Sequence, residues 1–123
     1  MKDKVGQRSG KSGPLTVLIG NSHRVLHRKK VSTELGETVM HKWTAFVECE
    51  DEAEAIDKVV FHLHPSFAPN VIEVTQPPFE VKQVGWGVFD IKVDIHRSNG
   101  RIHHHIFALS FVDDVNTEEV EFK

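Results

Sequence analysis

The sequence predicts an all-β domain built as an immunoglobulin-like antiparallel β-sandwich of about seven to eight strands. Apolar and polar residues alternate with period two in several separate segments, and turn-forming residues stand between these segments. No stretch has the length and pattern of a long helix, which argues against a parallel α/β sheet. A small β-barrel is the alternative architecture.

The expected strands follow from apolar side chains spaced two residues apart. In chain order, the alternating residues are Leu15, Val17 and Ile19; Trp43, Ala45 and Val47; Val59, Phe61 and Leu63; Phe89, Ile91, Val93 and Ile95; and His103, His105, Phe107, Leu109 and Phe111. In the fourth segment the intervening residues from Asp90 to His96 are all polar. This pattern predicts that one face of that strand is exposed to water.

Turn signals separate the expected strands. They lie at Gly20-Asn21, Gly36, Pro65, Pro69-Asn70, Pro77-Pro78, Gly85/Gly87 and Ser98-Asn99-Gly100. The segment from Glu48 to Lys58 has helical composition, but it is short and acidic. We expect it to form a loop or a single helical turn.

Length and composition predict one domain after a short arm. The chain has 123 residues, of which 39% are hydrophobic and 27% charged, a balance typical of a single globular domain. Residues 1–13 are polar and rich in Gly and Ser, so we expect a flexible basic arm followed by a sandwich domain over residues 14–123. No apolar run is long enough to span a membrane. With one cysteine, Cys49, no internal disulfide can form, which fits a reducing compartment.

The charge distribution is uneven. The net charge is −3, but residues 1–30 carry eight Lys/Arg and one acid, whereas the remaining residues carry seven Lys/Arg and seventeen acids. The arm is therefore expected to make weak, salt-sensitive contacts to DNA. The acidic body is expected to hold basic flanks of a partner. Its notable acids are Glu48, Glu50, Asp51, Glu52, Glu54, Asp113 and Asp114.

Several histidines suggest a metal site, and two serines and a cysteine suggest a catalytic site. The sequence disfavours both hypotheses. The histidines at issue are His62, His64, His96, His103, His104 and His105. Two H-x-H pairs on neighbouring strands could bind zinc, copper or nickel, but this spacing is common in histidine-rich strands, so no metal or other cofactor is expected. Ser66, Ser110 and Cys49 lack a nucleophile elbow, and no phosphate-binding glycine loop is present. The protein is expected not to be an enzyme.

Two loops combine an aromatic residue with small or polar neighbours. One is the run from His64 to Phe67, and the other is Gly85-Trp86-Gly87. Glycines on both sides of Trp86 allow the backbone amides to approach a ligand closely. This arrangement indicates binding, although core packing is the ordinary role of aromatic residues in a sandwich.

Several segments together resemble the YEATS domain family, over about residues 15–112. They are Gly20-Asn21, HKWTAFV (41–47), KVVFHLHPSF (58–67) and PPFEVKQVGWGVFDIKVDI (77–95), in the family's order and spacing. The resemblance implies an immunoglobulin-like sandwich. It also implies a reader of acylated lysine in histone tails.

The resemblance assigns roles to individual residues. Phe67 and Trp86 would form the two walls of an aromatic slot for the acylamide. His64 and Ser66 would be polar members of the same pocket. The backbone N–H of Trp86 would donate to the acyl carbonyl, and Gly85 and Gly87 would let this loop close in.

The chain departs from the family at the pocket mouth. Where many members have an aromatic residue or histidine just before the HxW segment, this chain has Val39 and Met40 ahead of His41. These three residues are expected at the rim of the pocket. His103, His104 and His105 fall near the last pocket-forming strand, and no role is assigned to them. A slot open at its far end should accept crotonyl at least as well as acetyl.

The resemblance also implies partners and location. The expected partners are an acylated histone tail and the other subunits of a nuclear acetyltransferase, remodelling or transcription complex. The alternative is an acidic protein-interaction or histone-binding module without dependence on acylation.

Overall fold

The computed structural model describes residues 13–33, 36–49 and 55–122. The expected basic arm, residues 1–13, therefore lies outside the described residues except for Gly13. The same holds for residues 50–54 of the acidic segment, which include Glu50, Asp51, Glu52 and Glu54. No helix within the described ranges is long and apolar enough to cross a membrane.

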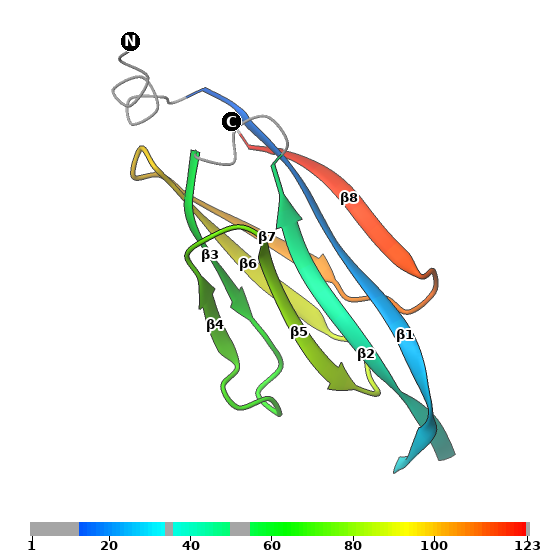
Figure 1. Ribbon diagram of the computed structural model, residues 1–123. Coiled ribbons are helices and arrows are strands. Elements are labelled where there is room, and N and C mark those ends of the chain that lie inside the picture. Colours follow the sequence, from blue (N-terminus) through cyan, green and yellow to red (C-terminus); the bar gives the residue numbers. More distant parts are fainter. Residues whose placement is uncertain (1–12, 34–35, 50–54, 123) are drawn as a thin grey trace.

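The described chain forms two antiparallel sheets packed face to face (Figure 1). The strands are β1 (Leu15–Thr33), β2 (Gly36–Glu48), β3 (Ile56–His62), β4 (Val71–Val74), β5 (Phe79–Gly85), β6 (Asp90–Arg97), β7 (Ile102–Ala108) and β8 (Val115–Phe122). One sheet has the order β5-β2-β1-β8, and the other has the order β4-β3-β6-β7. The predicted immunoglobulin-like sandwich is confirmed, and the alternative of a small barrel is wrong.

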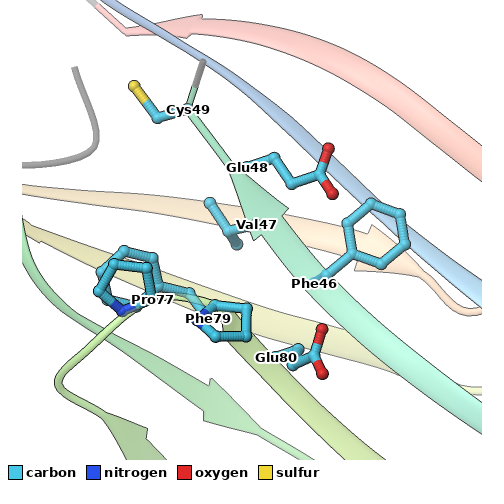
Figure 2. Close-up of a pocket in the computed structure, with 8 residues that line it drawn as sticks. Phe46, Val47, Glu48, Cys49, Pro77, Phe79 and Glu80 are labelled. Atoms are coloured by element: carbon cyan, nitrogen blue, oxygen red, sulfur yellow. The ribbon is translucent and has the colours of Figure 1, made fainter. Parts of the chain in front are cut away.

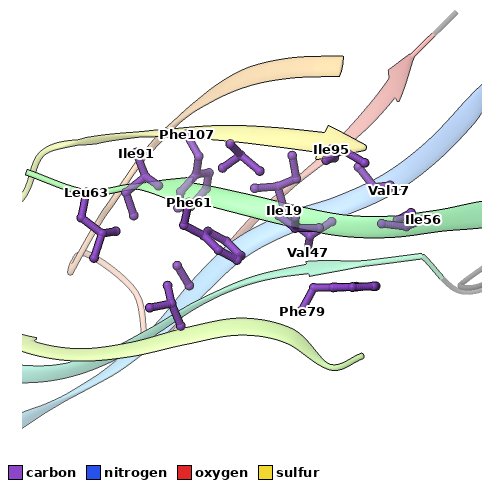
Figure 3. Close-up of a cluster of buried hydrophobic side chains, with 14 of the residues drawn as sticks. Val17, Ile19, Val47, Ile56, Phe61, Leu63, Phe79, Ile91, Ile95 and Phe107 are labelled. Atoms are coloured by element: carbon purple, nitrogen blue, oxygen red, sulfur yellow. The ribbon is translucent and has the colours of Figure 1, made fainter. Parts of the chain in front are cut away.

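The core is the layer of side chains between the two sheets (Figure 3). Each sheet contributes inward-facing residues, most of which the period-two pattern predicts, whereas Ile56, Phe79 and Val81 lie outside the predicted segments. From the first sheet these are Leu15, Val17, Ile19, Trp43, Ala45, Val47, Phe79 and Val81, and from the second Ile56, Val59, Phe61, Leu63, Ile91, Val93, Ile95, Phe107 and Leu109. Burial of these apolar side chains holds the sheets together. It also leaves the loops at the ends of the sandwich free to carry function.

The strand boundaries differ from the expected ones. Val88 and Phe89 precede β6 rather than begin it, and β2 continues to Glu48, within the segment expected to be a loop or helical turn. Strands β4, β5 and β8 were not among the expected alternating segments. β8 contains three glutamates and little apolar alternation, and it becomes a strand because the edge of β1 offers it hydrogen-bond partners from Leu15 to Ser22.

The turn predicted at Gly20-Asn21 is wrong, because both residues lie inside β1. Gly20 pairs with Phe46 of β2 and with Thr117 of β8. A Cβ at Gly20 would overlap the carbonyl oxygen of Asn116 and lie 2.8 Å from Thr117 Cγ2. The glycine therefore allows close approach of β8 rather than a turn. Asn21 is fully buried, and its Nδ2 donates to the carbonyl oxygen of Ser110 at 2.9 Å.

The wet face predicted for β6 is wrong at Asp94, which is only 9% exposed. His62 of β3 and His104 of β7 flank it, with Nε2 and Nδ1 at 2.7 Å and 2.6 Å from its two carboxylate oxygens. Burial by itself would raise the pKa of Asp94, but the hydrogen bonds from His104 and His62 outweigh this effect and lower it. Two imidazoles thus compensate the burial of the carboxylate.

The β1–β2 hairpin extends beyond the rest of its sheet (Figure 1). β5 ends its pairing at Gly85 opposite His41, and β8 begins its pairing at Val115 opposite Ser22. β1 and β2 continue to pair with each other as far as Thr33 and Gly36. The protruding part of β2 therefore reaches past the end of the sandwich.

Candidate functional site

An open groove of approximately 930 Å³ lies at the end of the sandwich where β3 and β5 finish. Three segments line it: the protruding start of β2, the β3–β4 loop, and the end of β5 with the loop that follows. The lining residues are Glu37, Thr38, Met40, His64, Ser66, Phe67, Val84, Gly85, Trp86, Gly87, Val88 and Phe89. All six residues that the resemblance assigns to the pocket are among them, whereas Pro65 of the first loop is not.

The two predicted wall residues are held differently. Phe67 is half-buried, and its ring packs edge-on against Trp43 and at a tilt against Phe89, with ring centroids 6.0 Å and 5.6 Å away. Trp86 is 50% exposed. Phe67 is thus anchored by core aromatics, whereas Trp86 projects from its loop and offers its indole to a ligand.

Gly85 lies at the end of β5, beside the aromatic cluster. A Cβ at this position would lie 3.5 Å from Phe67 Cζ and 3.7 Å from Trp43 Nε1. The indole N–H of Trp43 is buried and has no hydrogen-bond partner among the described residues. A Cβ at Gly87 would meet nothing within 4 Å, so this side of Trp86 is open.

His64 and Ser66 form a short hydrogen-bonded unit at the groove. The backbone N–H of Ser66 donates to Nδ1 of His64 at 3.1 Å, so this nitrogen is an acceptor. The Ser66 hydroxyl lies 2.9 Å from the same nitrogen and donates its proton to it. The lone pairs of Oγ then remain available to accept a hydrogen bond from a ligand.

Of the three residues expected at the rim, the structure brings only Met40 to the groove. Val39 and His41 are not among the lining residues. His41 stacks on Phe111 with ring centroids 3.9 Å apart, and its Nδ1 lies 3.0 Å from Nδ1 of His23. Burial and the charge of His23 lower the pKa of His41.

Five of the lining residues were not predicted as site residues: Glu37, Thr38, Val84, Val88 and Phe89. Phe89 was predicted to be a core residue of the following strand. It is partly buried and packs against the core residue Trp43, and it also contacts Phe67 and His64 at the groove. The GWGVF run was a usable signal, because Phe89 closely follows the glycine-flanked Trp86. Nothing in the sequence indicated Glu37 and Thr38, which reach the groove only because the hairpin protrudes.

The three consecutive histidines, His103 to His105, each contact a different partner. His104 contacts Asp94 on the outer face of its sheet. The ring of His103 stacks on that of Phe122 with centroids 4.6 Å apart, and Nε2 of His105 lies 2.6 Å from Oε1 of Glu118. The last two contacts join β7 of one sheet to β8 of the other. Within the part of the chain that the structure describes, no group of three or more potential ligands could hold a metal ion.

A smaller depression of approximately 290 Å³ lies at the opposite end of the β2–β5 pair (Figure 2). Phe46, Val47 and Cys49 line it from β2 and its end, and Pro77 and Phe79 from the start of β5. Glu48, Pro78 and Glu80 complete the lining. None of the predicted site residues reaches it.

Comparison with known proteins identifies the family to which the chain belongs. The model of the YEATS family matches residues 38–112. A protein named AF-9 homolog from Eremothecium gossypii is 38% identical over 85 residues, which cover 67% of this chain and 34% of that protein. Subunit 14b of transcription initiation factor TFIID from Arabidopsis thaliana is 42% identical over 59 residues, 46% of this chain and 22% of the relative. The chain thus spans about a third or less of these two relatives.

Solved structures of a YEATS domain are also similar to this chain. The Yaf9 YEATS domain bound to H3K27ac superposes with a TM-score of 0.69 at 28% identity, covering 89% of this chain and 84% of that one. The same domain recognising an H3K122suc peptide gives the same TM-score, identity and coverage. Both bound peptides carry an acylated lysine, acetylated in the first and succinylated in the second.

Proposed function

The chain belongs to the YEATS family, and on this premise we propose that it is a reader of acylated lysine in histone tails. The observation that carries the proposal is the groove itself. It brings together Phe67, Trp86, His64 and Ser66 from two loops that lie within the matched residues 38–112. A relative with the same fold binds H3K27ac.

The aromatic residues would select for acylation. Acylation removes the charge of the lysine and leaves a flat amide, which can lie between aromatic faces. An unmodified lysine would have to give up the hydration of its ammonium group in the same place. A slot between Phe67 and Trp86 therefore favours the acylated form.

Polar groups would fix the amide in the slot. The Ser66 hydroxyl, which donates to His64, has lone pairs that can accept the N–H of the acylated side chain. The backbone N–H of Trp86 is the proposed donor to the acyl carbonyl. Gly85 and Gly87 leave this part of the backbone uncovered. Such pairing matters because an amide buried without partners loses its hydrogen bonds to water.

The relatives suggest the setting of this activity. They include AF-9 homologs and a TFIID subunit, which are chromatin and transcription proteins. We therefore assign the chain to the nucleus, as a subunit of a chromatin-modifying, remodelling or transcription complex. It acts there as a binding module rather than as an enzyme.

Calorimetric titration with matched histone H3 peptides tests the proposal. Unmodified, acetylated and crotonylated forms of one peptide are titrated in parallel against the folded domain. We expect binding of both acylated forms, crotonyl at least as tightly as acetyl, and little binding of the unmodified form. Equal affinity for all three forms would instead support an acidic interaction module without acyl dependence.

A further inference from the structure

The smaller depression, at the end of the β2–β5 pair opposite to the groove, combines apolar and acidic lining residues (Figure 2). Its volume of approximately 290 Å³ is at the lower limit of the roughly 300–1,000 Å³ that is typical of small-molecule sites. Among its apolar residues, Val47 and Phe79 are buried, whereas Pro77 and Pro78 are exposed. The space therefore suits one side chain of a larger partner better than a free metabolite.

Phe46 offers an aromatic surface on the outer face of the sheet. It is half-buried and alternates with Ala45 and Val47, which are buried in the core. A Cβ at Gly20 would lie 3.0 Å from Cζ of Phe46, so the ring lies against β1 at a position without a side chain. A ring held in this way can contact an apolar side chain or a cation.

Two glutamates stand next to this ring. The Cα of Glu80 pairs with that of Phe46, and Glu48 follows two residues later on the same face of β2. Lys82 lies on the same face of β5, with its Nζ 3.6 Å from Oε1 of Glu80, and neutralises that carboxylate in part. No ion pair joins Glu48 to a cation within the described ranges.

The charge around the depression is therefore mainly negative. None of its eight lining residues is lysine, arginine or histidine. Glu119 of β8 extends the acidic border, because Leu18 of β1 pairs with both Glu48 and Glu119. A partner segment with a cation beside an apolar side chain complements this surface, whereas an acidic segment would be repelled.

We propose that the depression docks a basic segment of a partner protein. An apolar side chain of that segment enters the depression, and a flanking Arg or Lys lies over Phe46 between Glu48 and Glu80. Exposed ion pairs are weak, so the apolar anchor is what localises the segment. The inference does not depend on the proposed reader function, because the groove lies at the other end of the β2–β5 pair. The competing occupant is the chain's own basic arm, whose lysines and arginines lie outside the described residues.

Three short peptides separate the anchor from the charge. The first places Arg-Leu-Arg in a frame of glycine and serine, the second replaces the leucine by serine, and the third replaces both arginines by glutamine. In NMR titrations of the isotope-labelled chain, we expect the first peptide to shift the backbone amide signals of Phe46, Glu48 and Glu80. The other two should bind at least about tenfold more weakly, since each lacks one part of the interaction. Equal binding of the two arginine peptides would mean that only diffuse charge attracts them, and would overturn the proposal.

Two variants test the residues of the depression. Phe46→Thr, and separately Glu48→Gln with Glu80→Gln, should each lower the affinity for the Arg-Leu-Arg peptide at least about fivefold. The glutamate variant keeps the test valid if a melting curve shows that Phe46→Thr does not fold. The matched control is Asp113→Asn with Asp114→Asn, which removes two exposed carboxylates outside the depression and should leave the affinity unchanged. The same loss in the control would overturn the site.

Two further measurements distinguish the other occupants. Replacing Lys2, Lys4, Arg8 and Lys11 by glutamine should leave the peptide affinity within about twofold. A gain of about tenfold would make the basic arm the occupant and overturn docking of a partner. Sedimentation should show a chain that does not self-associate through this face. Self-association that Phe46→Thr abolishes would make a second copy the occupant instead.

The groove is tested separately from the depression. Trp86→Ala should leave the affinity for the Arg-Leu-Arg peptide unchanged, and loss of that affinity would place the peptide in the groove and overturn the proposal. Glu48→Gln with Glu80→Gln should preserve the ratio of acylated to unmodified histone peptide binding. Failure of the depression to bind the Arg-Leu-Arg peptide therefore leaves the reader function intact, and failure of acyl-lysine binding leaves this inference intact.

Discussion

Phe67 and Trp86 are both aromatic residues beside small or polar neighbours, yet they contribute differently to the molecule. Phe67 is packed against Trp43 and Phe89, so its ring is part of the aromatic support beneath the groove. Trp86 is half-exposed and stands between two glycines. Replacing Trp86 should therefore affect binding alone, whereas replacing Phe67 should affect both binding and stability.

Trp86→Ala should weaken binding of an acylated histone peptide by about thirtyfold, which corresponds to about 2 kcal/mol. The cause is the loss of one wall of a slot from which water is excluded. Titration calorimetry measures the affinity, and a melting curve confirms that the variant folds.

The matched control for this variant is Ile106→Ala, which removes an exposed apolar side chain from β7 outside the groove. It should leave affinity and melting temperature unchanged. Unchanged affinity in a folded Trp86→Ala protein would exclude the slot. Phe67→Ala should weaken binding as well, with a lower melting temperature.

His103 links protonation to stability. Burial, together with the charges of Arg97, Arg101 and His104, lowers the pKa of His103 below its ordinary value of 6.5. Between the lowered pKa and 6.5 the unfolded chain binds more protons than the folded chain, so folding stability falls as the pH falls through this window. The lowered pKa of His41 acts in the same direction.

His103→Phe should make the stability less dependent on pH below 6.5, since phenylalanine can still stack on Phe122 but does not titrate. The measurement is denaturant unfolding of the two proteins at pH 7 and pH 5. We expect a smaller loss of unfolding free energy at pH 5 for the variant. The same loss in both proteins would show that His103 does not contribute.

At the scale of the elements, close approach decides the position of β8. Its only strand neighbour within the described sheets is β1, and the contact depends on the absence of a side chain at Gly20. Across the sandwich, β8 also meets β7 through the contacts of His103 with Phe122 and His105 with Glu118. β8 thus closes one side of the molecule, although its own sequence is a weak strand former.

Gly20→Ala should destabilise the domain by about 2 kcal/mol or more, because the new Cβ would overlap a backbone oxygen that cannot rotate away. The melting temperature should fall by several degrees, as thermal unfolding monitored by circular dichroism would show.

Gly13→Ala is the matched control for this effect, since a Cβ at Gly13 would meet nothing within 4 Å. It should leave the melting temperature close to that of the wild type. Equal stability of the two variants would mean that β8 does not need the close approach to β1.

At the scale of the whole molecule, we expect the acidic surface and the groove to contribute to peptide binding in different ways. The chain beyond residue 30 carries ten more acids than Lys/Arg residues, and Glu48, Asp113 and Asp114 are exposed where the structure describes them. Exposed ion pairs with a basic histone tail are worth about 0.2–1 kcal/mol each and are screened by salt. Under the proposed function, they should tune affinity, while the groove should select for the acyl group.

Raising the ionic strength should therefore lower the affinity for all histone peptides but preserve the ratio of acylated to unmodified binding. Titrations of both peptide forms at low and at physiological salt measure this ratio. A ratio that collapses with salt would mean that charge, rather than the groove, distinguishes the peptides.

Much of the fold could be predicted because alternation reports directly on burial. Val17, Phe61 and Ile91 repeat with period two and face the core as expected. The binding loops were also identifiable, since glycines around Trp86 and the sequence from His64 to Phe67 are local features. Strand β8 and the buried Asp94 could not be predicted in this way, because β1, the neighbour of β8, and His62, a partner of Asp94, lie far from them in the sequence.

The sequence by itself determined the sandwich, its core and the two loops that carry the site, because each depends on short-range pattern and local backbone chemistry. Only the tertiary structure decided that Gly20 admits β8, that His62 and His104 enclose Asp94, and that Glu37 and Phe89 join the groove. Most of these features arise from contacts between segments tens of residues apart, and the exceptions are His104, ten residues from Asp94, and Phe89, which closely follows Trp86. Register and close approach between such segments are set by the packing of the whole molecule, and no local window of sequence contains both partners.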